Sequence, residues 1–217
     1  ERILNQICEG GFTHYEQSVR VVECLEKEGR GLNLTWEVRD GIRNHRTSGR
    51  PATMEGKIVR LSDKIAYINH DIDDAIRAGL LREDRLPEEF TKVLGHSVRE
   101  RLNTLIRNVI DSSLNQPDIR MDGEIEAAMQ GLRGFMFDHI YTNSAAKQED
   151  RKAQELLRRL SEYYMEHTEE LPEEYFNMIW IRRDPVSRVV CDYVAGMTDG
   201  YAIDTYQRLF VPVAWKY

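Results

Sequence analysis

The sequence predicts an all-α protein. Apolar residues recur with helical spacing along nearly the whole chain, and no segment shows the strict alternation of a half-buried strand. Glycines and prolines divide the apolar stripes into pieces of helix length. With 217 residues, the chain is long enough to bury a sizeable core.

Four segments organise the first part of the chain. Residues 18–28 are expected to be a helix that ends at Gly29, and residues 34–45 a second helix. Residues 46–52 contain Gly, Ser and Arg and read as a loop. Thr53 can cap a long helix that runs to Gly79.

Apolar stripes predict the remaining helices. The first three stripes are Val93, Leu94, Val98, Leu102, Leu105 and Val109; Ile125, Met129, Leu132, Met136 and Ile140; and Leu156, Leu157, Leu160, Tyr163 and Tyr164. Pro172 and Pro185 mark breaks before the last helices. Those helices carry Val189, Tyr193 and Met197, and then Tyr201, Tyr206 and Leu209.

Charge and cysteine usage narrow the class of protein. The chain has 30 basic and 37 acidic residues, a net charge of −7, which argues against a nucleic-acid footprint over the whole surface but allows a local basic pocket. Cys8, Cys24 and Cys191 are odd in number and widely spaced, so they support neither a disulfide framework nor a zinc ribbon. No apolar run approaches the ~18 residues of a membrane span, and no signal-peptide pattern is visible. A cytoplasmic protein without a membrane partner is expected.

The helix around residues 63–79 carries the most informative polar face. Its apolar stripe consists of Ile58, Leu61, Ile65, Ile68, Ile72 and Ile76. The opposite arc collects Arg60, Asp63, Lys64, Tyr67, His70, Asp71 and Asp74. Such an arc can simply be solvated. Its mixture of carboxylate, ammonium, phenol and imidazole groups is instead suited to binding a phosphate and a sugar.

Three ordered blocks of residues resemble one family. The run Asp63-Lys64-Ile65-Ala66-Tyr67, followed after three residues by Asp71-Ile72-Asp73-Asp74-Ala75, is the first block. Residues 11–20, Gly-Phe-Thr-His-Tyr-Glu-Gln-Ser-Val-Arg, form the second, and residues 32–38 with Gly41, Ile42 and His45 form the third. Together they resemble the deoxynucleoside triphosphate triphosphohydrolases, the dGTPase branch of the HD-domain phosphohydrolases. The resemblance is tight from Glu1 to about Gly79 and looser beyond.

The resemblance implies a role for individual residues. Asp63 would be the last carboxylate ligand of an active-site divalent cation, such as Mg or Mn. Lys64 would contact the substrate phosphates, and Tyr67 with Asp71 would hold the sugar 3′-hydroxyl. His14 would approach the α-phosphate as a catalytic residue, with Gln17 on its helix face as a substrate contact. Glu1 would be the acidic catalytic-site residue that orients a catalytic histidine three positions before it, upstream of this chain.

The chain departs from the family pattern in its metal ligands. The family holds its metal with a histidine and a His-Asp doublet that precede the block beginning at Glu1, and with the late aspartate. The pair His70-Asp71 lies on the helix of Asp63 and is not that doublet. The sequence is therefore expected to be the C-terminal portion of a longer protein. Residues 1–79 would complete an HD-domain-like helical bundle, and residues 80–217 would form a helical region that packs on it and makes oligomer contacts.

The function implied by the resemblance is metal-dependent hydrolysis of a deoxynucleoside triphosphate to a deoxynucleoside and tripolyphosphate, in a homo-oligomer. Two alternatives stay open: an inactive, nucleotide-binding regulatory relative, and an HD phosphohydrolase of another phosphoester. Among the other candidates, His45 can reach phosphate or cap a helix, and Tyr201 can line the base site or the core. His96, His139 and His167 lack ligand spacing, and Arg182-Arg183 is read first as a charged loop.

Overall fold

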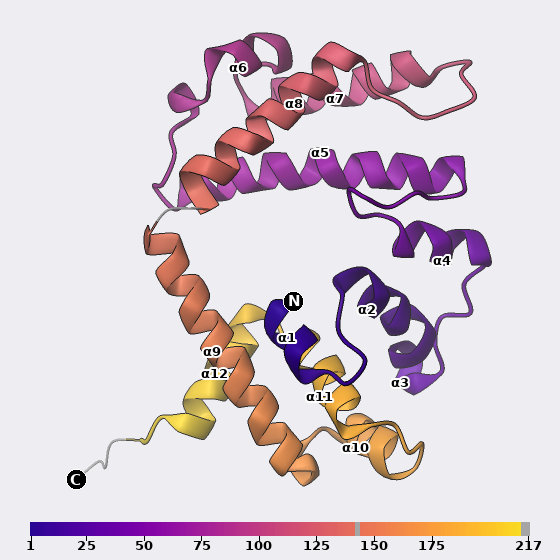
Figure 1. Cartoon of the computed structure of the whole chain (residues 1–217), viewed down its shortest axis with the longest axis vertical. Helices are drawn as coiled ribbons and strands as arrows, with labels where there is room; N and C mark the ends of the chain where they lie inside the picture. Colours follow the sequence, from indigo (N-terminus) through magenta and orange to yellow (C-terminus); the bar gives the residue numbers. More distant parts are fainter. Residues whose placement is uncertain (142–143, 214–217) are drawn as a thin grey trace. The chain divides into compact units, whose positions relative to one another are not determined.

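The structure, a computed structural model, describes residues 1–141 and 144–213 (Figure 1). Every regular element in these residues is a helix, which confirms the predicted all-α class. The chain forms two compact units, one made of Glu1–Asn33 with Gln148–Tyr217 (unit 1) and one made of Leu34–Lys147 (unit 2). None of the described helices is long and apolar enough to cross a membrane.

Unit 2 is built around one long helix. α5 runs from Met54 to Arg77 and contacts α4, α7 and α8, as Figure 1 shows. The other elements of the unit are α4 (Trp36–Arg43), η2 (Glu83–Arg85), α6 (Glu88–Leu94), α7 (Val98–Ser113), α8 (Gly123–Met136) and η3 (Phe137–Tyr141).

The start of α5 is fixed by a side-chain cap and by two glycines. Thr53 accepts a hydrogen bond from the backbone N–H of Gly56 at 3.0 Å, which confirms the predicted cap. A Cβ on Gly56 would lie 2.7 Å from the Cβ of Pro51 and 3.4 Å from the Cα of Gly41. These glycines therefore let α4 cross α5 closely.

The apolar stripe of α5 forms much of the core of unit 2. Ile65, Ile68 and Ile72 are buried. They pack with side chains from the neighbouring helices, among them Leu94, Leu105, Leu132 and Met136. The stripe is narrower than predicted, because Ile58 is 46% exposed.

The single helix predicted from the stripe of Val93 to Val109 is wrong. The chain forms α6 and α7 instead, with a break at Gly95, whose φ is +113°. A Cβ at Gly95 would lie 2.4 Å from the Cβ of Glu100, so only glycine fits there. Ser97 then caps α7 by accepting from the N–H of Glu100 at 3.2 Å.

Unit 1 collects the two ends of the chain. Its elements are α1 (Arg2–Ile7), α2 (His14–Arg20), η1 (Val21–Leu25), α3 (Glu26–Gly29), α9 (Ser144–Glu166, in this unit from Gln148), η4 (Thr168–Glu170), α10 (Glu173–Trp180), α11 (Val186–Ala195) and α12 (Asp199–Phe210). Its core joins the α1 side chains to Leu160 and Tyr164 of α9 and to Val189, Val190 and Val194 of α11. α10 and α11 begin directly after Pro172 and Pro185, which confirms the predicted breaks.

The helix predicted for residues 18–28 is also wrong as one regular element. The chain passes from α2 into a π-helical turn, η1, and then through Lys27 and Glu28, which have φ of +52° and +58°. Gly31 follows with φ +72°, and a Cβ there would lie 2.2 Å from the carbonyl oxygen of Glu23. The turn after α2 is therefore tight and irregular.

The two compact units divide the chain at Asn33 and at Lys147. Gly79, the expected limit of the phosphohydrolase core, lies inside unit 2, just after α5. The limits of a compact unit need not coincide with the limits of the phosphohydrolase core, so the division at Gly79 stays a prediction.

Candidate functional site

The polar arc of α5 faces outward in unit 2. Asp63 and Tyr67 are exposed, and Lys64 and Asp71 are partly buried, whereas Ile65 on the opposite side is in the core. The four residues thus share one accessible helix face. This is the arrangement that the sequence predicts for a nucleotide contact surface.

Lys64 lies in a cationic environment. Its pKa is lowered from the ordinary value, first by partial burial and then by the positive charge of Arg60, against the opposing charge of Glu126. Arg133 of α8 lowers it further. A bound anion would relieve this repulsion, so the surroundings of Lys64 favour a phosphate group.

A divalent cation does not fit the described residues alone. Asp63 supplies one exposed carboxylate, and no cluster of three or more His, Cys, Asp or Glu side chains in residues 1–141 and 144–213 is arranged to hold a metal ion. One carboxylate is not a ligand set for a catalytic metal. The role of Asp63 as a ligand stays a prediction.

Unit 1 brings two candidate catalytic residues together. The Nδ1 of His14, at the start of α2, lies 2.6 Å from Oε2 of Glu1. Partial burial raises the pKa of Glu1, but the hydrogen bond and charge of His14 outweigh it, so the pKa is lowered. Both side chains are about half exposed, and the Glu1 carboxylate is placed to orient the imidazole of His14.

Gln17 is buried in a polar network of unit 1. Its Nε2 donates to Oδ1 of Asp192 at 2.9 Å, and its Oε1 accepts from Arg188. Asp192 also accepts from Nε of Arg20. The side chain of Gln17 therefore holds α2 to α11, and its substrate contact stays a prediction.

Three of the remaining histidines have local partners. His45 Nδ1 lies 2.6 Å from the carbonyl oxygen of Ile42, as a residue that closes a helix end does. His139 Nδ1 lies 2.9 Å from the carbonyl oxygen of Phe135 and stacks on its ring, and His167 lies against Tyr163. These contacts agree with structural or surface roles.

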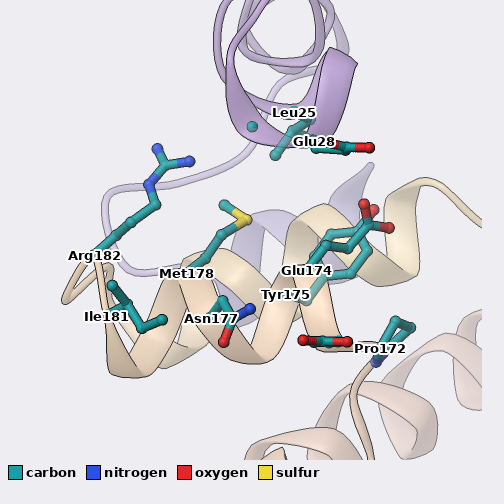
Figure 2. Close-up of a pocket in the computed structure, with 11 residues that line it drawn as sticks. Leu25, Glu28, Pro172, Glu174, Tyr175, Asn177, Met178, Ile181 and Arg182 are labelled. Carbon is teal, nitrogen blue, oxygen red and sulfur yellow. The ribbon is translucent and has the colours of Figure 1, made fainter.

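A cavity of about 650 Å³ opens in unit 1 beside α10 (Figure 2). The cavity is lined by three carboxylates, of Glu28, Glu173 and Glu174, and by the guanidinium of Arg182. Figure 2 shows Arg182 at one end of the lining helix and Glu174 towards the other. Three carboxylates would repel a triphosphate, so this cavity is a poor phosphate site.

A second cavity of unit 1, of about 390 Å³, has an aromatic wall. Tyr175, Tyr193 and Tyr201 line it, and the hydroxyls of Tyr193 and Tyr201 are 3.0 Å apart. Burial and this hydrogen bond raise the pKa of Tyr193. The side chain of Tyr201 is 49% exposed, so it lies at the edge of this cavity rather than in the core of unit 1. Its role at a base stays a prediction.

The sequence did not predict two buried polar clusters, one in each unit. Asn69, inside the Asp63 block, is buried, donates to the carbonyl oxygen of Ile65 at 2.8 Å and accepts from Nε of Arg101 at 3.2 Å. Arg101 is almost fully buried and pairs with Glu83. In unit 1, the counterpart is Asp192. A polar residue at an apolar position of a stripe was the available signal for Asn69, and Arg188 four residues before Asp192 was the signal for that pair.

The chain matches known proteins along nearly its whole length. Residues 119–208 match the family described as phosphohydrolase-associated domain. A deoxyguanosinetriphosphate triphosphohydrolase-like protein of Caldanaerobacter subterraneus subsp. tengcongensis is 46% identical over 99% of this chain and 63% of its own length. Relatives with the same name from Clostridium perfringens and Geobacter metallireducens are 43% and 32% identical, over 98% of this chain and over 64% and 68% of their lengths.

The chain thus spans about 63% of the length of the Caldanaerobacter relative. The match covers 99% of this chain, so it spans the segments that carry α5 and His14. The chain belongs to the family of the deoxyguanosinetriphosphate triphosphohydrolase-like proteins.

Proposed function

We propose that the whole protein hydrolyses deoxynucleoside triphosphates to a deoxynucleoside and tripolyphosphate in a metal-dependent reaction. The observation that supports this most is the outward arc of α5, where a carboxylate, an ammonium group, a phenol and a second carboxylate share one face. The names of the relatives point to the same chemistry.

Lys64 is proposed to bind the substrate phosphates. Its neighbours Arg60 and Arg133 keep the local potential positive, so negative charge that develops on phosphate oxygens is stabilised there.

Tyr67 and Asp71 are proposed to read the sugar. They lie one helical turn apart on α5, so a hydroxyl and a carboxylate can converge on one 3′-hydroxyl. A sugar without that hydroxyl would lose the hydrogen bonds to both groups, which disfavours its binding.

His14 is proposed to handle a proton at the α-phosphate end of the substrate. The carboxylate of Glu1, 2.6 Å from Nδ1 of His14, is a hydrogen-bond partner that holds the imidazole in place for proton transfer. The same contact orients the ring, with Nδ1 towards Glu1.

The metal enters the proposal only through Asp63, and the described residues do not complete its ligand set. A divalent ion would polarise a phosphoryl oxygen and help form the attacking hydroxide. Every role assigned above belongs to a side chain of this protein.

The test is product analysis of the whole protein by ³¹P NMR. With a deoxynucleoside triphosphate and Mg or Mn, we expect tripolyphosphate and no orthophosphate as the first product. Asp63→Asn should abolish turnover and leave the helical circular dichroism unchanged. Asp74→Asn is the matched control, because Asp74 is an exposed carboxylate of the same arc about three turns along α5.

Two results would contradict the proposal. A wild-type protein that binds nucleotides but releases no tripolyphosphate would be the regulatory relative instead. A protein that cleaves monophosphates and leaves triphosphates intact would belong to another phosphoester class.

A further inference from the structure

Unit 2 contains a cavity whose loop, Lys57 and Asp118 have no part in the proposed reaction, although Arg60 on its wall also adds positive charge near Lys64. It has a volume of about 540 Å³ and is lined by the loop residues 47–51, by Lys57 and Arg60 of α5, and by Asp118 and Ile119. Its size falls within the range of small-molecule sites, roughly 300–1,000 Å³. Lys64 does not line it.

The charge of this cavity is opposite to that of the protein. Arg50, Lys57 and Arg60 contribute three positive charges and Asp118 one negative charge, a net +2, in a chain of net charge −7. A concentrated positive region on an acidic protein attracts anions selectively. The cavity is therefore suited to a ligand with several negative charges.

The loop that forms one wall is held in place by α4. Asp40 accepts from the N–H of Ala52 at 2.7 Å and from Nδ2 of Asn44 at 2.8 Å. Gly49 donates its N–H to the carbonyl oxygen of Arg46 at 2.8 Å, and a Cβ on Gly49 would lie 2.2 Å from the carbonyl oxygen of Asn44. A wall fixed in this way loses little entropy when a ligand binds.

Arg60 is positioned with donor capacity to spare. Its Nη1 donates to the carbonyl oxygen of Thr47 at 3.1 Å, while its Nε is buried without a hydrogen-bond partner among the described residues. Arg133 of α8 reaches Oγ1 of Thr47 at 3.5 Å and adds positive charge behind the loop. A buried N–H without a partner is costly, and an anion in the cavity would relieve that cost.

We propose that this cavity binds an oligophosphate chain, either as part of a nucleoside triphosphate or as free tripolyphosphate. Arg50, on the loop, and Lys57 with Arg60, one turn apart on α5, present charges from two walls, which fits a chain of phosphates better than one phosphate. The site is separate from Lys64 and does not rest on the proposed reaction.

Asp118 sets the resting state of the cavity. Its carboxylate lies 2.7 Å from Nζ of Lys57, and this contact lowers the pKa of Asp118. An incoming phosphate would compete with Asp118 for the ammonium group. Loss of the carboxylate should therefore strengthen anion binding.

The experiment is calorimetric titration of the whole protein with tripolyphosphate, with inorganic phosphate and with a non-hydrolysable deoxynucleoside triphosphate, in EDTA so that no metal bridges ligand and protein. We expect tripolyphosphate to bind at least tenfold more tightly than phosphate. Weaker binding of both triphosphate ligands in Lys57→Gln would assign the cavity to nucleotides, and weaker binding of tripolyphosphate alone would assign it to the free phosphate chain.

Single substitutions decide where the phosphate chain binds. Lys57→Gln and Arg60→Gln should each weaken the Kd for tripolyphosphate about tenfold, and Asp118→Asn should tighten it severalfold. Arg77→Gln is the control, because Arg77 is an exposed cation of the same helix outside the cavity. Because Arg60 also supports the loop, Lys57→Gln and Asp118→Asn carry the test if Arg60→Gln disturbs folding.

Three results would overturn the site. Unchanged affinity in Lys57→Gln and Asp118→Asn excludes it, and so does an equal loss in Arg77→Gln, which would indicate unspecific attraction. Loss of binding in Lys64→Gln alone would move the phosphate to Lys64. The Lys64→Gln result would support the phosphate role proposed for Lys64, whereas the results for Lys57, Asp118 and Arg77 do not bear on the proposed reaction, because hydrolysis is not measured.

Discussion

The guanidinium of Arg20 lies against the carboxylate of Asp192, with Nε 2.8 Å and Nη2 2.7 Å from Oδ2. Burial lowers the pKa of Arg20, but the hydrogen bonds and charge of Asp192 outweigh it and raise the pKa. Gln17 and Arg188 contact the same carboxylate. Asp192 is therefore the anionic centre that joins α2 to α11.

Asp192→Asn should destabilise unit 1 strongly. The change leaves Arg20 and Arg188 without their shared counter-charge, and breaking a buried pair costs about 3–5 kcal/mol. Both guanidinium groups are about one-fifth exposed and can regain some water, so we expect about 3 kcal/mol in urea unfolding. Asp204→Asn, an exposed carboxylate of α12, should change the free energy of unfolding by less than about 0.5 kcal/mol. Equal stability of the two variants would refute the central role of Asp192.

Thr53→Ala should weaken the start of α5. The hydroxyl of Thr53 satisfies the N–H of Gly56, and loss of such a cap costs about 1 kcal/mol. Ser62→Ala tests the same type of change at an exposed interior position of α5, where alanine is neutral or favourable. Denaturant midpoints of the two variants should differ, and coincident midpoints would mean that the cap carries no stability.

The cysteines should differ in reactivity. Burial, together with the neighbouring Cys8 thiol, raises the pKa of Cys191 to about 12. At pH 8, alkylation followed by peptide mass spectrometry should modify the partly exposed Cys24 first and leave Cys191 intact in the folded protein. Faster modification of Cys191 than of Cys24 would contradict its buried position.

The same pKa makes stability depend on pH. The folded state holds Cys191 as the neutral thiol, whereas the unfolded chain ionises near the ordinary value of 9.0. Stability from this group is therefore present below pH 9 and is lost as the pH rises from 9 towards 12. In Cys191→Ala, urea unfolding between pH 8 and pH 11 should show a smaller decline than in the wild type, and parallel declines would remove this explanation.

Asp71→Ala should reduce discrimination at the sugar. If Asp71 binds the 3′-hydroxyl, losing a charged hydrogen bond of about 1.5–3 kcal/mol corresponds to a ten- to hundredfold change in selectivity. The measurement compares kcat/KM for a deoxynucleoside triphosphate and its 2′,3′-dideoxy analogue in the whole protein. Asp74→Ala, on the same helix, should keep the wild-type ratio. An unchanged ratio in Asp71→Ala would mean that Asp71 does not read the sugar.

α5 was predictable because local signals and the tertiary fold agree. Thr53 caps it, the isoleucine stripe faces the core, and Arg77 lies in its last turn, near the predicted end at Gly79. The outward position of Asp63 and Tyr67 follows from the same periodicity. Here the helical periodicity of the sequence and the free energy gained by burying the isoleucine stripe favour the same orientation of the helix.

The break between α6 and α7 carried a signal that periodicity hides. Ser97 and Glu100 have the spacing of a capping box, in which Glu100 accepts from a backbone N–H, here that of His96 at 2.8 Å. Gly95 precedes them and supplies the positive φ. The apolar residues on either side keep a helical period across the break, so the stripe alone suggested one helix.

Other features depend on contacts between distant residues. The π-helical turn of η1 and the left-handed Lys27 and Glu28 have no local signature, because neither residue favours that conformation. The cavity lined by Lys57 and Asp118 joins positions far apart in the chain. Periodicity within one helix cannot predict such a pairing.

Asn69 fixes the rotation of α5 about its own axis. Its hydrogen bond from Nε of Arg101, on α7, can form only when α5 is turned one way about its own axis, whereas its bond to Ile65 lies within α5. Each residue of a helix is rotated by about 100° about the axis relative to the one before it. One residue inserted between Lys57 and Asn69 would therefore turn Lys57 about a quarter of a turn away from its cavity. Every side chain would still be present, and the helix would still form. The outward face of α5 is thus specified by the count of residues from Asn69 as well as by their identity.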